Sequence, residues 1–385
     1  MITDSPHLYR RNGVINSVPE EVLSNSLMQA GRVEQYGLAS ILTLKHLAVQ
    51  ARSSYGFLRG IVERKFDPYT DIKIKRTNGR IMRPVSSPSP GLMPIQRWIL
   101  AHIVSRLGTH PNSFAYTRNK SIKSCASKHL GANWLVRLDV QNFFESIDES
   151  SVYRVFAEAG YQPLAAFELA RICTRYAPHA HHVDAERFRS KSHYATIRQY
   201  NMPYMGFVPQ GAPTSGALAN LVAKDLDLTL TQVAEKYGAA YTRYSDDMTF
   251  SSTSKFTRSK ALSLIEESRT ALFMNGFRLH DKKTQIQPPG ARKTILGLLV
   301  DGDSVHLNKR IRSRIENHVR GAEKFGLRSH YSHVNFASLE GFVNHVSGLI
   351  AFWLDIDPEN SQDIQKRWKE TLRRDGWHQV DYWRM

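Results

Sequence analysis

The sequence predicts an α+β fold, in which helices alternate with short strands that can pair into an antiparallel sheet. Hydrophobic residues make up 41% and aromatic residues 10% of the 385 residues. These proportions are typical of a globular chain that is long enough for two or three subdomains. No Gly-x-Gly-x-x-Gly segment follows a predicted strand and no Walker lysine motif occurs, which argues against a doubly wound nucleotide-binding sheet.

The first part of the chain, residues 1–68, is expected to form a helical N-terminal extension. Within residues 19–66, "PEEVLSNSLMQAG" opens with Pro19 and two acidic residues, as a helix N-terminus prefers. "SILTLKHLAVQARSS" then repeats apolar residues at three- and four-residue steps, which is the spacing of one helix face.

From Tyr69 the pattern changes to that of a basic β-hairpin. In "YTDIKIKRTNGRIMRPV", isoleucines alternate with lysines and the Asn78–Gly79 pair provides a turn. "SSPSPG" is expected to break the chain before a helix in "LMPIQRWILAHIVSRL".

The rest of the chain continues this alternation. "NWLVRLDVQNFF" predicts a short apolar strand that ends on Asp139, and "SSVYRVFAEAGY" and "PLAAFELARICTRYA" predict helices. Residues 176–205 are polar and irregular, so we expect an inserted loop. One helix is expected over "APTSGALANLVAKDLDLTLTQVAEKYG" and a strand–turn–strand unit over Tyr241–Ser252. A helix in "SKALSLIEESRTALFMNGF", a hairpin in "KTILGLLVDGDSV" and basic helices from Lys309 complete the prediction.

The charge balance indicates a polyanionic partner. Lys and Arg number 52 against 35 Asp and Glu, a formal net charge of +17, and nucleic acid is the commonest ligand of so basic a chain. A membrane-surface role would require a clustered basic helix, whereas these residues are spread along the chain. There are only two cysteines, Cys125 and Cys173, and no apolar run is long enough for a signal peptide or a bilayer span. We therefore expect a soluble, cytoplasmic protein.

Three aspartates suggest chemistry on phosphates. Asp139 ends an apolar strand, and Asp246 and Asp247 lie in the hairpin "YTRYSDDMTFSS". Each has an ordinary alternative: a strand-end cap for Asp139, and a solvated turn for the pair. Mg²⁺ prefers a few carboxylates plus substrate phosphates, and two such ions about 3.5–4 Å apart can promote an in-line displacement. Three acids from two non-adjacent strands therefore suit two-metal nucleotidyl transfer.

Two neighbouring segments fit the same chemistry. Phe144 follows Asp139 by five residues. Its ring could lie under the sugar of an incoming nucleotide and collide with a 2′-hydroxyl, the alternative being core packing. In "GFVPQGAPTSGALANL", small residues would let the backbone approach a base pair, and Gln210 could hydrogen-bond near it.

These segments together resemble the reverse transcriptase family. "RLDVQNFFESI", "PQGAPTSGALANL" and "RYSDDMTFS" are similar to its three palm motifs. "GFRLHDKKTQI", "TILGLLVDG" and "IKIKRTNGRIMRPV" are similar to the lysine-bearing motif, the primer-grip hairpin and the basic fingers hairpin. The resemblance implies a right-hand polymerase with RNA-directed DNA polymerase activity. It places the fingers at 69–133, the palm at 134–290 with 176–205 inserted, the primer grip at 291–308, and a helical thumb and tail at 309–385.

The resemblance also implies roles for individual residues. Asp139 and Asp246 would be the principal ligands of two Mg²⁺ ions, with Mn²⁺ as a substitute, and Asp247 would complete the cluster. The backbone of Val140 would face the metals and the triphosphate, and Phe144 would favour deoxynucleotides. The remaining nucleotide-binding residues would be Gln210, Gly211, Lys75, Arg80, Arg83 and Lys282, with Lys283 as a general acid. General template contact is the alternative for the basic residues of the fingers hairpin.

Within the family, the motifs resemble those of bacterial retron reverse transcriptases. Ala126 and His129 of "SCASKHLGANW" keep part of a retron segment in which Cys125 replaces Asn. Ile295–Leu296–Gly297 keeps only the glycine of a Val-Thr-Gly segment. A related defence-associated reverse transcriptase is therefore the alternative assignment.

Other basic residues are candidate nucleic-acid contacts. His129 is expected to contact RNA, with buried packing as the alternative. His179, His181, His182 and Asp184 lie near Cys173, but their spacing matches no structural zinc pattern, so a solvated loop that contacts RNA or a partner is favoured. Phosphate contacts of a template–primer duplex are expected from the thumb residues Lys309, Arg310, Arg312, Arg314 and Arg320.

The expected function is the copying of an associated structured non-coding RNA into cDNA from dNTPs, in a bacterial retron or anti-phage defence system. The expected partners are that RNA, its cDNA, and an effector or toxin protein from the same operon, and an oligomer is possible. The alternatives are an enzyme that makes untemplated or protein-primed DNA, and a catalytically silent RNA-binding scaffold for an effector.

Overall fold

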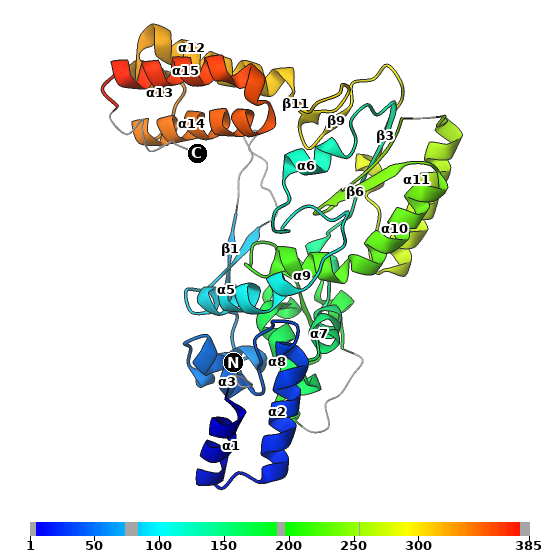
Figure 1. The fold of residues 1–385 in the computed structure, drawn as a ribbon, viewed down its shortest axis with the longest axis vertical. Helices are drawn as coiled ribbons and strands as arrows, with labels where there is room; N and C mark the ends of the chain where they lie inside the picture. The colour runs from blue at the N-terminus through cyan, green and yellow to red at the C-terminus, as the bar shows by residue number, and fades with distance from the viewer. Residues whose placement is uncertain (1–4, 74–83, 191–196, 254, 378–385) are drawn as a thin grey trace.

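The computed structural model describes residues 5–73, 84–190, 197–253 and 255–377. In Figure 1 the N-terminal helices lie at one end of the long axis and the C-terminal helices at the other, and β6 lies between them, nearer the C-terminal helices. None of the helices in these described parts of the chain combines the length and the apolar character needed to cross a bilayer.

The N-terminal region is helical, as expected, and most of it belongs to the main core. Its helices are α1 (Pro6–Ile15), α2 (Glu20–Glu34), α3 (Leu44–Gln50) and α4 (Tyr55–Val62). Leu58 and Ile61 of α4 lie in the same hydrophobic cluster as Val136 of the central sheet. Just after α4, the buried Arg64 pairs with Glu149 and donates to the Thr174 carbonyl (2.8 Å). A buried ion pair of this kind ties the region to the body of the molecule.

The expected basic hairpin is present at its base. Strand β1 (Tyr69–Ile72) pairs antiparallel with β2 (Val85–Pro88). The expected break at "SSPSPG" (86–91) is wrong for its first residues, because β2 continues to Pro88. Ser86 also donates its N–H to the Gln210 carbonyl (2.8 Å), which extends the pairing beyond the hairpin. The turn between the two strands lies outside the described residues. Helix α5 (Leu92–His102) and the short helix η2 (Val104–Arg106) follow.

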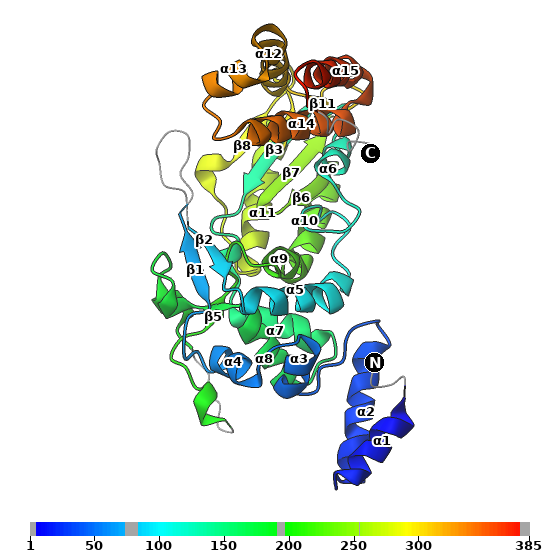
Figure 2. The same cartoon turned by 90° about the vertical axis from the view of Figure 1, so that its left-hand side faces the viewer.

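The central sheet has the strand order β6-β7-β3-β8 and is antiparallel throughout. Its strands are β3 (Trp134–Asp139), β6 (Ala240–Tyr244), β7 (Asp247–Ser252) and β8 (Gln285–Gln287). Figure 2 shows this sheet between the C-terminal helices and the helical layer around α5, α7 and α9. We call it the catalytic sheet because the three aspartates for which the sequence predicts catalysis lie on it or in its β6–β7 turn.

The helices beside the catalytic sheet are α7 (Glu149–Glu158), α8 (Pro163–Cys173), α9 (Ser215–Val222), α10 (Lys224–Lys236) and α11 (Arg258–Met274). The single helix expected across α9 and α10 is wrong. Ala223 has φ −82° and ψ 8°, which departs from helical geometry, so the direction changes there. Asn220 at the end of α9 donates to the Ala115 carbonyl, whereas α10 lies along β6 and α11.

The described residues of the 176–205 segment do not form the expected irregular loop. Strands β4 (Arg175–Tyr176) and β5 (Gly206–Phe207) pair antiparallel across the base of the segment. The described residues between them form the short helices η4 (Ala177–His179), η5 (Ala185–Phe188) and η6 (Arg198–Tyr200). Phe188 and Phe207 form a small separate core, and this apolar contact explains the order that a polar composition did not predict.

A second large core lies in the C-terminal region. The expected hairpin is a three-stranded sheet of β9 (Thr294–Ile295), β10 (Leu298–Leu299) and β11 (His306–Leu307). The helices α12 (Lys309–Phe325), α13 (Leu327–His333), α14 (Leu339–Ile356) and α15 (Pro358–Arg374) then pack around Phe342 and Trp368. The short helix α6 (Ile122–Ser127), which the sequence did not indicate, adds Ala126 to this core.

Candidate active site

The three aspartates meet at one edge of the catalytic sheet. In the β3–β7 register, Asp139 stands directly opposite Asp247. The N–H of Val140 donates to the Asp246 carbonyl (3.1 Å). The backbone N–H of Val140 is therefore already hydrogen-bonded, and of its two backbone polar groups only the carbonyl could bind a ligand. Antiparallel pairing therefore brings together acids that lie about a hundred residues apart in sequence.

The turn that carries Asp246 is as tight as a hairpin allows. Tyr244 pairs with Asp247, so only Ser245 and Asp246 form the loop. Ser245 has φ 60°, the left-handed region that two-residue hairpin turns require. Asp139 is 7% exposed, and Asp246 and Asp247 are half-buried. The pair is thus not a solvated turn, and Asp139 does not cap its strand toward solvent.

The charges at this edge are only partly compensated. Burial and then the charge of Asp139 raise the pKa of Asp246. Burial also raises the pKa of Asp247, against the opposing influence of Arg137, whose Nη2 lies 3.6 Å from Asp247 Oδ1. Lys283 holds Asp139, with Nζ 3.0 and 2.8 Å from its two carboxylate oxygens.

This donor set fits a hard divalent cation. Carboxylate oxygens are the ligands that Mg²⁺ prefers, and a cation would relieve the repulsion among three crowded acids. In the described parts of the chain, no three His, Cys, Asp or Glu side chains already stand in a metal-binding arrangement, and Asp139 is engaged by Lys283 instead.

A buried network behind the turn was not anticipated from the sequence. Arg243 and Asp227 are both 0% exposed, with Arg243 Nε and Nη2 2.8 and 2.6 Å from the two Asp227 oxygens. Arg243 Nη1 also donates to Asn220 Oδ1 and to the Ser245 carbonyl, both at 3.0 Å. The network thus holds the catalytic turn from inside. An arginine in the apolar strand "YTRY" was the available signal, because a buried charge needs a partner.

The loop before α9 lies against the fingers hairpin. Gly211 has φ 114°, and a Cβ there would lie 2.3 Å from Val85 Cγ1. A side chain at this position would therefore separate β2 from the loop. Gln210 is exposed and its carbonyl receives the Ser86 N–H, so the structure joins the expected nucleotide-binding loop to the base of the hairpin.

Two of the other expected nucleotide-binding residues, Phe144 and Lys282, lie in described parts of the chain. Phe144, in the short helix η3 (Phe144–Ser146), is half-buried and contacts Phe143 edge-on at 5.5 Å between ring centroids. Lys282 is exposed beside Lys283 in η7 (Asp281–Lys283). The residues Lys75, Arg80 and Arg83 lie outside the described residues.

The expected RNA contact at His129 is wrong. The side chain is 1% exposed, and its Nδ1 and Nε2 each lie 2.7 Å from a hydroxyl, those of Ser251 and Thr242. Burial lowers the pKa of His129 to about 4. It is a neutral core residue that connects α6 to β6 and β7, with no face left for RNA.

The zinc alternative for the 176–205 segment gains no support. Cys173 is fully buried, and burial raises the pKa of its thiol to about 12. His182 faces Asp71, with Nδ1 3.8 Å from Oδ2. Cys173 and His182 therefore have different neighbours and do not form a shared zinc site.

The C-terminal helices carry a basic surface hollow of about 460 Å³, which we call the thumb groove. Arg310, Arg314 and His318 follow one another at four-residue steps on α12, and His330 and His333 of α13 also line the hollow. His330 is 8% exposed, and its Nε2 has no hydrogen-bond partner among the described residues. The sequence analysis named none of these histidines, and His330 and His333 lie on a different helix from the arginines.

The other expected basic residues of α12 are less concentrated. Lys309 and Arg320 are exposed and Arg312 is half-buried, and none of the three lines the thumb groove. Of the five, the structure brings only Arg310 and Arg314 together in one hollow.

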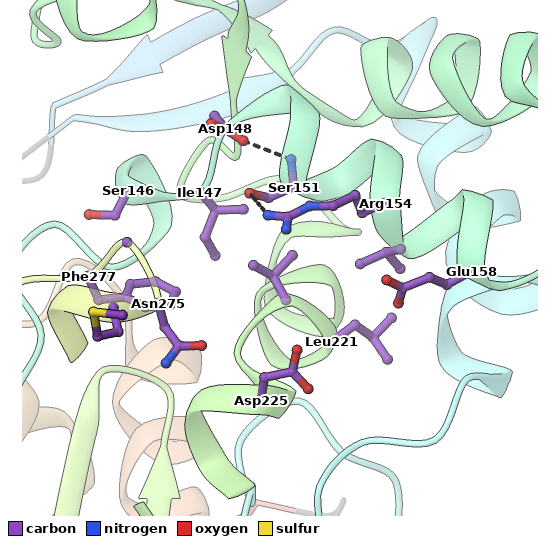
Figure 3. A pocket seen from close by; sticks show the side chains of 14 residues that line it. Ser146, Ile147, Asp148, Ser151, Arg154, Glu158, Leu221, Asp225, Asn275 and Phe277 are labelled. Carbon is purple, nitrogen blue, oxygen red and sulfur yellow. Dashed lines mark hydrogen bonds between the residues drawn. The ribbon is translucent and has the colours of Figure 1, made fainter. Parts of the chain in front are cut away.

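A second hollow, of about 390 Å³, lies between α7, the α9–α10 junction and the end of α11 (Figure 3). Asp148, Glu158 and Asp225 line it together with Arg154. Asp148 accepts the Ser151 N–H (2.7 Å) and so caps α7. None of the described site residues lines this hollow, and its acidic lining does not suit nucleotide phosphates.

Comparison with known proteins agrees with this geometry. Residues 74–299 match the family described as Reverse transcriptase (RNA-dependent DNA polymerase). The chain is 27% identical to the Retron Ec86 reverse transcriptase of Escherichia coli over 339 residues, covering 86% of this chain and 90% of that protein.

Two retron proteins from Myxococcus xanthus are also similar. The Mx162 reverse transcriptase is 31% identical, covering 57% of this chain and 44% of that protein. The Mx65 reverse transcriptase is 26% identical, covering 90% and 76%. With the family match and the acidic sheet edge, these similarities show that the chain belongs to the reverse transcriptase family and is an RNA-directed DNA polymerase of the retron type.

Proposed function

We propose that this polymerase copies an associated structured non-coding RNA into DNA by two-metal nucleotidyl transfer, as part of a bacterial retron that serves anti-phage defence. The observation that carries the mechanism is the meeting of Asp139, Asp246 and Asp247 at one sheet edge, with their charges only partly compensated. Two bound Mg²⁺ ions would activate the primer hydroxyl and stabilise the leaving pyrophosphate.

The residues of the chain would divide the work around those ions. Asp139 and Asp246 hold them, with the Val140 carbonyl beside them, while Asp247 adds negative charge. Lys283 exchanges its contact with Asp139 for the pyrophosphate and donates a proton to it. Phe144 excludes the ribose 2′-hydroxyl, and Gln210 and Gly211 line the nascent base pair. The triphosphate contacts are assigned to Lys75, Arg80, Arg83 and Lys282.

The rest of the chain would hold the nucleic acid. We assign 69–133 to the fingers, 134–290 to the palm, 291–308 to the primer grip and 309–385 to the thumb and tail. The thumb groove suits the phosphodiester backbone of a template–primer duplex, because A-form duplexes are recognised by shape and backbone. Phosphate contacts are assigned to Lys309, Arg310, Arg312, Arg314 and Arg320. A cytoplasmic location and an effector protein from the same operon belong to the same proposal.

The test is DNA synthesis by the purified protein with its co-purifying RNA, dNTPs and Mg²⁺. Asp246→Asn keeps the size of the side chain but removes the charge, and we expect activity to fall by at least about a thousandfold. Asp363→Asn, the same change at an exposed aspartate of α15, serves as the matched control. Equal cDNA yields from wild type and Asp246→Asn would contradict polymerisation at this edge.

Sequencing the product decides between templates. A cDNA complementary to the co-purified RNA supports the proposal, whereas homopolymeric or repetitive DNA supports untemplated synthesis. RNA binding without any synthesis, under conditions in which the wild type and Asp246→Asn behave alike, would identify a scaffold.

A further inference from the structure

The segment that precedes α6 reaches the active site. Residues 112–114 lie along β6, an edge strand of the catalytic sheet, where Ser113 forms a parallel bridge with Arg243. Phe114 donates its N–H to the Arg243 carbonyl (2.8 Å), and the Ala115 carbonyl accepts from the Asn220 side chain. Strand β6 on one side and α9 on the other therefore fix the backbone immediately before Tyr116.

Tyr116 has an unusual conformation for a bulky residue. Its φ is 57° and its side chain is 57% exposed. A non-glycine residue with positive φ is strained, and such strain persists only where the surroundings impose it and is concentrated at functional sites. Exposure of a large aromatic ring in a strained position indicates a role other than core packing.

Helix α9 provides a seat for the Tyr116 ring. A Cβ at Gly216 would lie 2.4 Å from Tyr116 Cγ and 2.6 Å from Cδ1. Any side chain at Gly216 would push the ring off the helix, so the ring position depends on this glycine. Gly216 lies in the buried first turn of α9, just after the Gln210–Gly211 loop.

From this seat the ring reaches both the expected sugar gate and the catalytic turn. The Tyr116 and Phe144 rings meet edge-on, with centroids 6.2 Å apart and planes at 63°. Tyr116 Oη lies 3.4 Å from Oγ of Ser245, the residue before Asp246. Phe144 is thus flanked by Phe143 at 5.5 Å and by Tyr116.

We propose that Tyr116 is a specificity-determining residue of this polymerase, which holds the Phe144 ring in place and thereby sets the discrimination against ribonucleotides. The inference rests on the gate role proposed for Phe144. A ring excludes a 2′-hydroxyl only if it cannot turn away, because reactivity depends on positions held to within about 1 Å. Without Tyr116, one side of Phe144 loses its support.

The experiment measures kcat/KM for a dNTP and for the matching rNTP on a defined primer–template. Tyr116→Ala is expected to lower the dNTP/rNTP ratio by about three- to tenfold, the effect of losing one edge-on aromatic contact. Tyr116→Phe keeps the ring and is expected to hold the ratio within about twofold. A purely structural role would lower kcat/KM for both nucleotides equally and leave the ratio unchanged, which would overturn the inference.

Gly216→Ala tests the same contact without changing Tyr116. The added methyl displaces the ring, so the ratio should fall as in Tyr116→Ala, and the double variant should be no less selective than either single variant. Additive losses would contradict a shared mechanism. If Tyr116→Phe loses as much as Tyr116→Ala, the hydroxyl contact with Ser245 acts instead of the ring.

Phe144→Ala separates this inference from the function on which it rests. A lowered ratio in Phe144→Ala together with an unchanged ratio in Tyr116→Ala retains the gate and rejects Tyr116. An unchanged ratio in Phe144→Ala rejects the gate itself, and the inference with it.

Discussion

The catalytic sheet and the C-terminal helices place charge in opposite ways. On the sheet, three acids crowd at an edge where Asp139 is 7% exposed, and the strand register sets their positions. On α12, Arg310 and Arg314 stand exposed at helical spacing around a shallow hollow. The first arrangement suits atoms that must be held within a fraction of an ångström. The second suits a polyanion that is bound through its backbone with little sequence preference.

Because the charges of the sheet region are buried, we expect the stability of the protein to depend strongly on a single buried ion pair. Arg243→Met leaves Asp227 buried without its ion pair, so we expect a loss of about 3–5 kcal/mol in the free energy of unfolding. Denaturant unfolding followed by circular dichroism measures it.

The matched control lies on the surface. Arg269→Met removes a partly exposed pair with Asp281 and should cost less than about 1 kcal/mol. Adding Asp227→Leu to Arg243→Met should restore much of the loss, because a buried pair can be replaced by apolar side chains. If both variants lost the same free energy of unfolding, buried and exposed ion pairs would contribute equally, which would contradict the prediction.

The C-terminal helices should instead tolerate substitution in folding but lose affinity. Removing two phosphate contacts with Arg310→Ala and Arg314→Ala should weaken duplex binding by about tenfold near 0.15 M salt, and should lower the slope of log K against log salt by about two. Fluorescence anisotropy over a salt series measures both.

Lys236→Ala is the control for that experiment. Lys236 is an exposed lysine on α10, paired with Glu267, away from the thumb groove. It should leave the salt slope unchanged. A slope that stays at the wild-type value in the double arginine variant would show that the duplex lies elsewhere.

The smallest expected effect concerns two histidines. The pKa of His129 is lowered to about 4 by burial, and that of His318 to about 4 by burial and then by the nearby His330, Arg314 and His345. The unfolded chain therefore binds protons at these sites between about pH 6.5 and pH 4 that the folded chain does not. Stability contributed by the neutral histidines should be fully present above this window and fall as the pH is lowered through it.

Duplex binding should affect His318 but not His129. Imidazole NMR shifts, followed against pH with and without duplex, should show the pKa of His318 rising on binding because a phosphate stabilises the imidazolium. The pKa of His129 should stay unchanged. A parallel rise in both would mean that the effect is conformational.

The fold followed from sequence where local pattern was enough. The apolar run ending on Asp139 formed β3, and the Tyr241–Ser252 hairpin formed β6 and β7. Long-range partners could not be read in this way. Lys283 lies 144 residues from Asp139, and His129 lies 113 and 122 residues from its two hydroxyl partners. No periodicity within a segment indicates such a pairing.

The expected site residues and the residues that support them differ in how visible they are in the sequence. Short sequence motifs contain the aspartates, Phe144 and the Gln210–Gly211 loop, so these residues are visible in the sequence alone. Tyr116 and Arg243 contact residues on other helices and strands, so the sequence around either residue does not indicate its role. The break at Ala223 is of the same kind, because α9 and α10 turn toward different partners.

The sequence by itself determined the alternation of helices and strands, the basic charge, and the aspartates on which the proposed chemistry rests. These properties depend on residues close in the chain, whose backbone preferences and side-chain types are local. The tertiary structure alone decided that Asp139 faces Asp247, that His129 is buried, and that Tyr116 rests on Gly216 beside Phe144. Those outcomes depend on strand register and on close packing between distant segments, which are settled only when the whole core forms.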